Sequence, residues 1–333
     1  MTAEVAVLGA GSWGTALADL LARKGVRVAL WAFEPEVSES INARHTNDVF
    51  FPGHTLDPAL HASADLAEVL RGAPVVLSVV PSHVSRDVWM QAAPYLAPGA
   101  RLVCATKGLE PDSLELMCDV ASEALPGTPF VALSGPSFAH EVFEGQPTAV
   151  VAASTDALAA EEAQQLFATG YFRVYTSTDV IGVEVGGSLK NTIAIAAGVL
   201  EGLGLGNNPR AALLTRGLAE ISRLAVAMGA QPETLAGLAG MGDLILTCSG
   251  ALSRNRQLGV LLAQGTTLEQ YRATHRNVAE GVNTARAASQ LGKIHGVDMP
   301  ITRQVSAILF EGVAPLDSIQ GLMDRTLKAE QWG

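Results

Sequence analysis

The chain has 333 residues, with 22 lysines and arginines against 33 aspartates and glutamates, for a formal net charge of −11. Such an acidic chain has no long-range attraction to polyanions, which argues against nucleic acid as a partner. A small anionic substrate is still compatible, because helix termini and single basic residues act locally. Apolar residues make up 48% of the chain, aromatic residues 5%, and there are 33 glycines, as in a compact α/β or helical protein. At about 150 residues per domain, the length predicts two domains.

The cysteines and the apolar runs indicate the compartment. Cys104, Cys118 and Cys248 form no Cys-x-x-Cys pair and no even-numbered framework, which is typical of a reducing cytoplasm and inert thiols. Glu4 interrupts the start of the chain, so we expect no signal peptide. The most apolar run, residues 193–200, is too short to cross a bilayer. These features predict a soluble, cytoplasmic protein without stable membrane insertion.

The first half of the chain alternates short apolar runs with amphipathic segments. The runs predict strands over residues 5–8, 26–31, 75–80, 102–105, 130–133, 148–152 and 172–175. The segments between them predict helices that include residues 15–24, 84–93, 114–124 and 157–167. Continuous apolar strands separated by helices indicate a parallel sheet covered on both faces.

After about residue 178 the strand pattern ends, and only helical patterns follow. We expect helices over residues 182–200, 211–228, 255–263, 284–291 and 301–310. The predicted fold class is therefore an α/β, Rossmann-like, doubly wound N-terminal domain over residues 1–180, followed by an all-α domain over residues 181–333. The boundary is placed near 178–182 because the pattern changes there, and no linker composition marks it.

The sharpest local motif is the glycine turn GAGSWG at residues 9–14, between the first expected strand and the first expected helix. At such a junction the first glycine permits a tight turn, the second lets the backbone approach a pyrophosphate, and the third lets the helix pack on the sheet. Gly9, Gly11 and Gly14 therefore indicate a dinucleotide site at a positive helix end. The alternative is a turn that serves packing only.

The end of the second expected strand bears on the choice of cofactor. Glu34 lies about twenty residues after Gly14, where an acid usually binds the adenosine ribose. No arginine or lysine occupies residues 31–36 to pair with a 2′-phosphate. Phe33 and Glu34 therefore favour NAD over NADP, although Arg44 or another distant cation could still reach that phosphate.

Two of the five lysines stand in apolar, glycine-flanked sequence. Lys107 follows an expected strand, at the carboxyl edge where open α/β sheets bind ligands. Lys190 lies in an expected helix with Gly186 and Gly187 one turn before it, and these small residues would leave a hollow for a nicotinamide or a substrate. An amine beside a secondary alcohol can accept the hydroxyl proton and, as ammonium, return it to a ketone. Burial disfavours the charged amine and a nearby phosphate favours it. A snorkelling or salt-bridged lysine remains the alternative for Lys190.

Later segments suit a small anion. Asp243, in the glycine-rich run 240–243, could orient a lysine or a substrate hydroxyl. Ser253 is a candidate N-cap, which places Arg254 and Asn255 in the first turn of a helix. A helix start with a guanidinium and an amide suits a phosphate, although an ordinary cap beside surface arginines has the same sequence.

The turn at residues 134–139 follows another expected strand and contains Gly135, Ser137 and Ala139. It could contact cofactor and substrate, or simply redirect the chain. The seven histidines show no His-Glu-x-x-His spacing and no Cys/His cluster is present, so we expect no metal site.

Taken together, these motifs resemble bacterial NAD(P)-dependent sn-glycerol-3-phosphate dehydrogenase from residue 7 to about residue 327. The motifs that carry the resemblance are GAGSWGTALA at 9–18, VVPSH at 79–83, ATKGLE at 105–110, SGPSFAHEV at 134–142, GGSLKN at 186–191, AGMGDLILTC at 239–248, SRNR at 253–256 and VAEGVNTA at 278–285. Agreement of all eight in order excludes chance.

The resemblance implies roles for individual residues. The residues that would contact the dinucleotide are Ser12, Trp13, Phe33, Ala139, Val278 and Glu280. Those that would line the meeting point of substrate and cofactor are Lys107, Gly135 and Ser137, with Lys190 as the proton acceptor. Those that would hold glycerol phosphate are Asp243, Ser253, Arg254 and Asn255, with Arg254 also touching the cofactor.

Position 33 departs from the family pattern, because many relatives carry Arg or His near Phe33. This departure agrees with the preference for NAD read from Glu34. The resemblance further implies reduction of dihydroxyacetone phosphate in the cytoplasm at the start of glycerophospholipid synthesis. It implies a second domain like that of 6-phosphogluconate dehydrogenases and, by analogy only, a homodimer through that domain.

Two other functions fit parts of the pattern. A different hydroxyacid dehydrogenase would share the two-domain plan and a lysine, but the SRNR and GGSLKN motifs argue against it. A nicotinamide-sensing protein would keep the glycine turn but need neither Lys190 nor Asp243. The leading hypothesis is reversible interconversion of dihydroxyacetone phosphate and sn-glycerol 3-phosphate, with hydride transfer at C2 and Lys190 moving the hydroxyl proton. It requires Lys190 and Arg254 to converge on one pocket beside the glycine turn.

Overall fold

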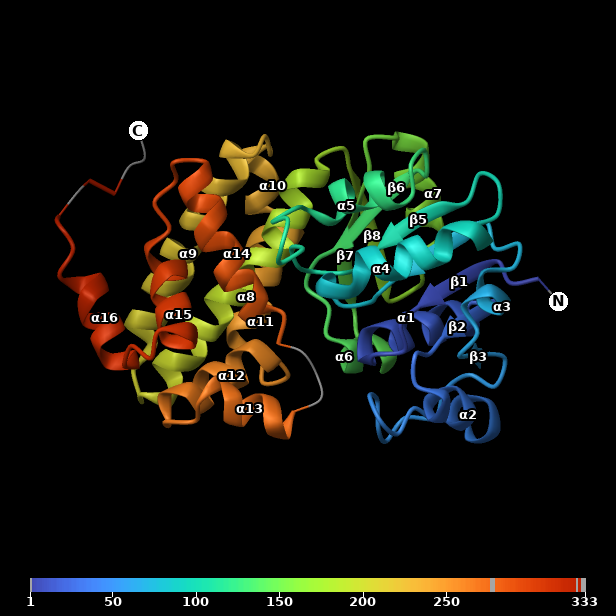
Figure 1. Cartoon of the computed structure of the whole chain (residues 1–333), viewed down its shortest axis with the longest axis horizontal. Coiled ribbons are helices and arrows are strands. Elements are labelled where there is room, and N and C mark those ends of the chain that lie inside the picture. Colours follow the sequence, from blue (N-terminus) through green and yellow to red (C-terminus); the bar gives the residue numbers. More distant parts are fainter. Residues whose placement is uncertain (1, 276–278, 328, 331–333) are drawn as a thin grey trace.

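The computed structural model describes residues 2–275, 279–327 and 329–330. Its first half is a sheet flanked by helices, and its second half is helical (Figure 1). The strands are β1 (Val5–Leu8), β2 (Val28–Trp31), β3 (His61–Ser63), β4 (Val75–Ser78), β5 (Arg101–Cys104), β6 (Phe130–Ser134), β7 (Thr148–Ala153) and β8 (Phe172–Ser177). The helices among them are α1 (Ser12–Arg23), α2 (Pro35–Arg44), α3 (Leu66–Leu70), α4 (Ser82–Ala92), the 3-10 turn η1 (Ala93–Tyr95), α5 (Met117–Ala124), α6 (Ala139–Phe143) and α7 (Ala157–Phe167).

The sheet has the order β3-β2-β1-β4-β5-β6-β7-β8. The order reverses between β1 and β4, so the loops after these two strands flank the crevice where open sheets bind ligands. Neighbouring strands are parallel except β6 and β7, which are antiparallel. The prediction of a parallel sheet is confirmed apart from this pair. There the connection holds only the short helix α6 and turns the chain back along β6, instead of crossing over the sheet.

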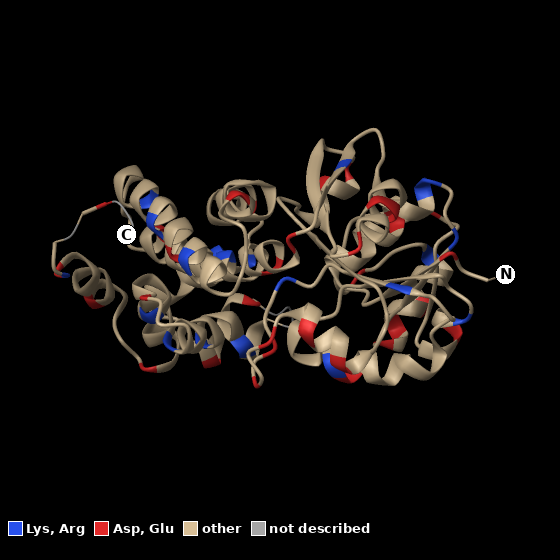
Figure 2. Ribbon diagram, turned by 90° about the horizontal axis from the view of Figure 1, so that it is seen from above, with Lys and Arg blue, Asp and Glu red and all other residues tan. Residues whose placement is uncertain are grey.

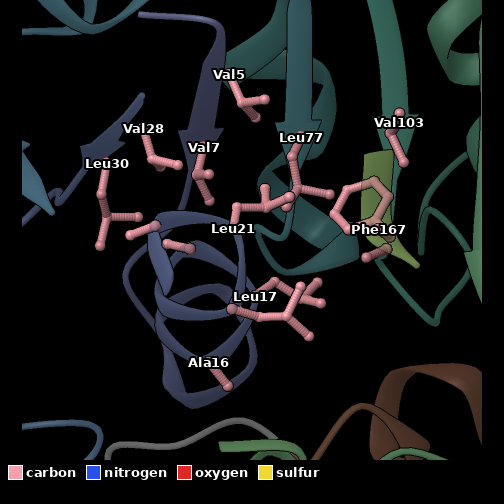
Figure 3. Packing of buried hydrophobic residues seen from close by; sticks show 14 of the residues in the cluster. Val5, Val7, Ala16, Leu17, Leu21, Val28, Leu30, Leu77, Val103 and Phe167 are labelled. Atoms are coloured by element: carbon pink, nitrogen blue, oxygen red, sulfur yellow. The ribbon is translucent and has the colours of Figure 1, made fainter. Parts of the chain in front are cut away.

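Both faces of the sheet are covered, as the unbroken apolar runs predict. Successive residues of a strand point to opposite faces. Val7 lies in a core cluster with Leu17 and Leu21 of α1, and Figure 3 shows these side chains between helix and sheet. Leu8, the next residue of β1, lies in a second cluster with Trp89 of α4. Polar residues on either face of β1 would be buried, which explains the absence of polar alternation.

The second half consists of helices around one central helix, α8 (Val180–Gly202). The others are α9 (Asn207–Ala227), α10 (Pro232–Ala236), the π-helical turn η2 (Leu238–Gly242), α11 (Asp243–Ser249), α12 (Arg254–Ala263), α13 (Leu268–Thr274), α14 (Gly281–Ile294), α15 (Pro300–Phe310) and α16 (Pro315–Met323). The backbones of α8 and α12 touch, because an ideal Cβ on Gly198 would lie 1.9 Å from the Arg256 carbonyl oxygen. In the part of the chain that is described, α8 alone is long and apolar enough to cross a membrane, but 89% of its apolar window is buried in the fold. Its apolarity therefore serves the core.

Several elements differ from their predicted bounds. Helix α1 begins at Ser12 rather than near residue 15, so the glycine turn itself forms the helix start. Helix α5 begins at Met117 rather than at residue 114, because Leu114 has a left-handed φ of 66° that a helix cannot accommodate. The edge strand β3 was not predicted, since three residues with one buried side chain give no pattern. The glycine-rich residues 238–249 were not predicted to be helical either, yet they form η2 and α11.

Candidate active site

The residues of the glycine turn pack against one another and against the residues that follow β4. Gly9 has φ of 108°, and a Cβ there would lie 3.1 Å from the Val79 carbonyl oxygen. A Cβ on Gly14 would lie 1.9 Å from the Gly9 oxygen, so only glycine lets α1 start so close to the strand. Gly11, the N-cap of α1, has no neighbour within 4 Å of its Cβ position, which leaves open space before the helix end. This open helix N-terminus fits an anionic group.

Two further residues of the turn complete its surroundings. Ser12 Oγ donates to the Phe50 carbonyl oxygen at 2.5 Å and so ties α1 to the segment after α2. The Trp13 ring packs on the core, 6.5 Å from the Phe172 ring, and its Nε1 is buried without a hydrogen-bond partner in the structure. An unpartnered indole N–H beside an open helix N-terminus fits a ligand that carries acceptor oxygens, such as a dinucleotide.

Phe33 and Glu34 follow β2, next to the strand that leads into the glycine turn. The Phe33 side chain is 75% exposed, and its ring packs edge-on against Trp31. Glu34 is half-buried at the N-cap position of α2, and its side chain makes no capping hydrogen bond. Neither side chain is committed to the core, so both are available to a ligand in the crevice.

Two lysines from different halves of the chain meet on one carboxylate. Asp243 Oδ2, at the start of α11, accepts from Lys107 Nζ at 2.9 Å and forms a closer ion pair with Lys190 Nζ of α8. Lys107 Nζ also donates to the Gly135 carbonyl oxygen at 2.8 Å and to Ser137 Oγ at 3.4 Å. The structure therefore brings these five predicted site residues together.

The charges of this cluster depend on burial. Burial lowers the pKa of Lys190 to about 7, and the charge of Lys107 acts in the same direction, although Asp243 favours the ammonium. Burial alone would raise the pKa of Asp243, but the two lysines outweigh it and hold that pKa below its ordinary value. At neutral pH the cluster thus holds a carboxylate and a lysine that exchanges its proton readily.

The predicted hollow beside Lys190 is absent, and that hypothesis is wrong. A Cβ on Gly186 would lie 2.6 Å from the Ala239 carbonyl oxygen, and one on Gly187 would lie 2.4 Å from Ser134 Oγ. These glycines bring α8 against η2 and β6, and no space for a ligand remains on that side. The small residues instead set the depth at which Lys190 is buried.

The residues that were predicted to bind an anion lie at the start of α12. Ser253 is the N-cap, and its Oγ accepts from Arg256 N at 3.2 Å. Arg254 is the first residue of the helix and is exposed. Asn255 is buried: its Nδ2 donates to Asn191 Oδ1 at 2.9 Å, and its Oδ1 accepts from Gly281 N at 3.0 Å. One amide hydrogen of Asn255 is left for other partners.

Glu280 joins the helical half to the sheet. Its carboxylate accepts from Ser82 Oγ at 2.9 Å and from Ser82 N at 3.4 Å, at the start of α4. Burial raises the pKa of Glu280, while the nearby positive charge of Arg254 acts against that rise. Arg254 therefore lies near Glu280, which contacts Ser82, and the loop between β4 and Ser82 packs on Gly9. Arg254, Glu280 and the glycine turn thus lie along one edge of the sheet.

Three polar residues that we did not predict complete the cluster. Asn191 Nδ2 donates to the Lys107 carbonyl oxygen at 3.2 Å. Thr247 Oγ1 donates to Asp243 Oδ1 at 3.3 Å, and Ser82 holds Glu280. All three stand inside motifs quoted above, and Asn191 and Thr247 follow Lys190 and Asp243 by one residue and by one helical turn. This spacing from Lys190 and Asp243 is the sequence feature from which Asn191 and Thr247 could have been predicted as site residues.

Ala139 and Val278 are the remaining predicted site residues. Ala139 is the first residue of α6 and packs on the same core cluster as α1. Val278 lies outside the described residues. Among the residues described, no group of three or more His, Cys, Asp or Glu side chains could hold a metal ion.

Comparison with known proteins agrees with this geometry. Residues 4–160 match the N-terminal part, and residues 179–320 the C-terminal part, of the NAD-dependent glycerol-3-phosphate dehydrogenase family. A glycerol-3-phosphate dehydrogenase (NAD(P)+) of Geobacter sulfurreducens is 54% identical, with 100% of each chain covered. One of Rhodospirillum rubrum is 51% identical over 98% of this chain and 94% of its own.

A solved structure extends the likeness to three dimensions. The glycerol-3-phosphate dehydrogenase of Coxiella burnetii matches with a TM-score of 0.94 at 40% identity, covering 97% of this chain and 99% of the other. The sheet domain and the helical domain are thus both shared with that structure. The protein belongs to the NAD-dependent glycerol-3-phosphate dehydrogenase family of oxidoreductases.

Proposed function

We propose that the protein interconverts dihydroxyacetone phosphate and sn-glycerol 3-phosphate with NAD or NADP, and that Lys190 moves the hydroxyl proton. The observation that carries this proposal is the buried ion pair of Lys190 with Asp243. The pKa of Lys190, about 7, suits proton transfer in both directions near neutral pH. The bound nicotinamide would supply or accept the hydride at C2. Oxidation of added reduced nicotinamide on addition of dihydroxyacetone phosphate tests the activity, and no oxidation across pH would refute it.

In this proposal, each residue around Lys190 has a separate role. Neutral Lys190 accepts the proton of the C2 hydroxyl during oxidation, and its ammonium returns a proton to the ketone during reduction. Asp243 holds the amine in place, and Lys107 shares that carboxylate and so positions Asp243 beside Lys190. Arg254 and the start of α12 take the phosphate, with Ser253 fixing the helix start. The buried setting keeps competing water away from the amine.

The pH dependence follows from the lowered pKa of Lys190. For oxidation, kcat/KM should rise with pH through about 7, because the free amine is the active form. For reduction it should fall through the same range, because the ammonium is then required. Asp243→Asn should move this midpoint downward, since Asp243 favours the ammonium. Steady-state rates in both directions measure it, and a midpoint that stays fixed in Asp243→Asn would exclude Lys190 as the titrating group.

The choice of cofactor is set, we propose, at the end of β2. Phe33→Arg should improve the use of NADP relative to NAD about tenfold, because a guanidinium can pair with the 2′-phosphate. Phe33 is exposed, so the change should leave the free energy of unfolding nearly unaltered. Values of kcat/KM for both cofactors measure the ratio, with Phe33→Gln as the uncharged control. An unchanged ratio would show that position 33 does not face the ribose.

Location and assembly rest on the resemblance alone. We propose that the protein acts in the cytoplasm, in the synthesis of glycerophospholipid precursors, and forms a homodimer through the helical domain. Light scattering coupled to size-exclusion chromatography measures the molar mass, and a monomer at micromolar concentration would refute the dimer.

A further inference from the structure

Lys107 stands on a segment that has no regular secondary structure. Residues 105–116 connect β5 to α5 and contain neither helix nor strand. One side of this segment is fixed in the helical domain, where Leu109 and Leu116 are buried in a cluster with Leu189 of α8. The backbone at Lys107 is held by Asn191. On the side of the sheet, Thr106 Oγ1 donates to the Val80 carbonyl oxygen at 2.7 Å, which leaves the part of the segment after Leu109 to be held by other contacts.

Arg86 of α4 binds that part of the segment. Its Nε donates to Glu110 Oε1 at 2.8 Å and its Nη2 to Glu110 Oε2 at 2.8 Å, a bidentate pair. Nη2 also donates to Glu115 Oε2 at 2.8 Å, and Nη1 to Glu123 Oε2 of α5 at 2.6 Å. One guanidinium thus contacts the second half of the segment at Glu110 and Glu115, and also the following helix α5.

The contacts of Arg86 differ in exposure, and Glu110 is the most protected. The side chains of Arg86 and Glu110 are 27% and 13% exposed, whereas that of Glu123 is 56% exposed. Hydrogen bonds from Arg86 lower the pKa of Glu110, so this pair stays ionised throughout the range of an enzyme assay. Ser113 Oγ adds a hydrogen bond to Glu110 Oε2 at 2.5 Å. Glu110 is therefore the link through which Arg86 acts on the segment.

We propose that Arg86 is a positioning residue: by holding Glu110 and Glu115 it fixes segment 105–116, and thereby keeps Lys107 Nζ on the Asp243 carboxylate beside Lys190. Arg86 touches neither substrate nor cofactor in this proposal, and it rests on the function proposed above. Without Arg86, residues 110–115 lose their contact with α4, and the ion pair of Lys107 Nζ with Asp243 should be less well fixed. Because the charge of Lys107 lowers the pKa of Lys190, the midpoint of the pH profile should then move upward.

The experiment compares Arg86→Gln and Glu110→Gln with two matched controls. Glu123→Gln removes an exposed partner of the same guanidinium that lies outside the segment, and Arg101→Gln breaks an exposed ion pair with Glu162 elsewhere in the sheet domain. Arg86→Gln and Glu110→Gln should each lower kcat roughly tenfold and raise the midpoint, with the Kd for NADH unchanged. The two controls should keep wild-type kcat and midpoint.

The sign of the midpoint shift separates positioning from plain electrostatics. Arg86→Gln removes a positive charge and Glu110→Gln a negative one, so long-range charge effects would shift the pKa of Lys190 in opposite directions. The positioning role proposed for Arg86 predicts that the midpoint of the pH profile moves upward in both variants. Opposite shifts, or an unchanged kcat with only a lower Tm, would overturn the proposal. If Arg86→Gln fails to fold, Glu110→Gln, which keeps the shape of the side chain, still decides.

Lys107→Met distinguishes failure of this inference from failure of the proposed function. A large loss of kcat in Lys107→Met together with wild-type kcat in Arg86→Gln would refute only the positioning role of Arg86. Wild-type rates in Lys107→Met would refute the proposed site. Arg86→Lys should recover only part of kcat, because an ammonium cannot bind the three carboxylates in the fixed geometry of a guanidinium.

Discussion

Lys190→Ala is expected to lower kcat by roughly 10³-fold or more while changing the Kd for NADH by no more than a few-fold. Proton transfer by a positioned side chain contributes about 10²–10⁴-fold to a rate. Lys107, the other amine on Asp243, is held by Gly135, Ser137 and Asp243 and so should not replace Lys190. The dinucleotide turn lies in the other half of the chain, so cofactor binding should survive. Single-turnover rates and fluorescence titration with NADH measure the two quantities separately.

The fold should tolerate this truncation, which makes the result interpretable. Asp243 keeps Lys107 as a partner in the variant, so no buried carboxylate is left unpaired. Lys293→Ala, on the exposed face of α14, is the matched control and should keep wild-type rates. A small primary amine added to Lys190→Ala should restore part of the rate by entering the space vacated. A variant with near-normal kcat would show that Lys190 is not the proton acceptor.

The fold was largely readable from the sequence, for a physical reason. Strands buried on both faces must be continuously apolar, and β1, with every residue buried, is the clearest case. Where burial is one-sided or short, as in the edge strand β3, the same rule gives no signal. The antiparallel pairing of β7 was not readable either, because pattern reports burial and not direction.

The candidate site was predicted in its residues but not in its contacts. Lys107, Lys190 and Asp243 were each singled out as chemistry-bearing groups in glycine-rich sequence, yet nothing in the sequence showed that both amines share one carboxylate. Gly187 was misread for the same reason, since the sequence cannot show that Ser134 occupies the space beside it. Local sequence identifies reactive groups, whereas tertiary packing decides what each group touches.

Arg254→Ala is expected to raise KM for dihydroxyacetone phosphate about 100-fold with a smaller change in kcat. A guanidinium–phosphate pair contributes roughly 1.5–3 kcal/mol through charge-assisted hydrogen bonds, and the pair forms as much in the bound substrate as in the transition state. Arg254 is exposed at the start of α12, and Ser253 supplies the cap, so the helix should remain intact without the arginine. Arg272→Ala, an exposed arginine of α13, is the matched control.

Dihydroxyacetone, which lacks the phosphate, decides whether Arg254 acts on that group. If it does, wild-type protein and Arg254→Ala should reduce dihydroxyacetone with the same low kcat/KM, and the 100-fold difference should appear only with the phosphorylated substrate. An equal loss on both substrates would instead place Arg254 at the cofactor or at Glu280, whose pKa its charge already influences. The Kd for NADH separates these two cases: a weaker Kd indicates the cofactor, whereas an unchanged Kd with a displaced pH profile indicates Glu280.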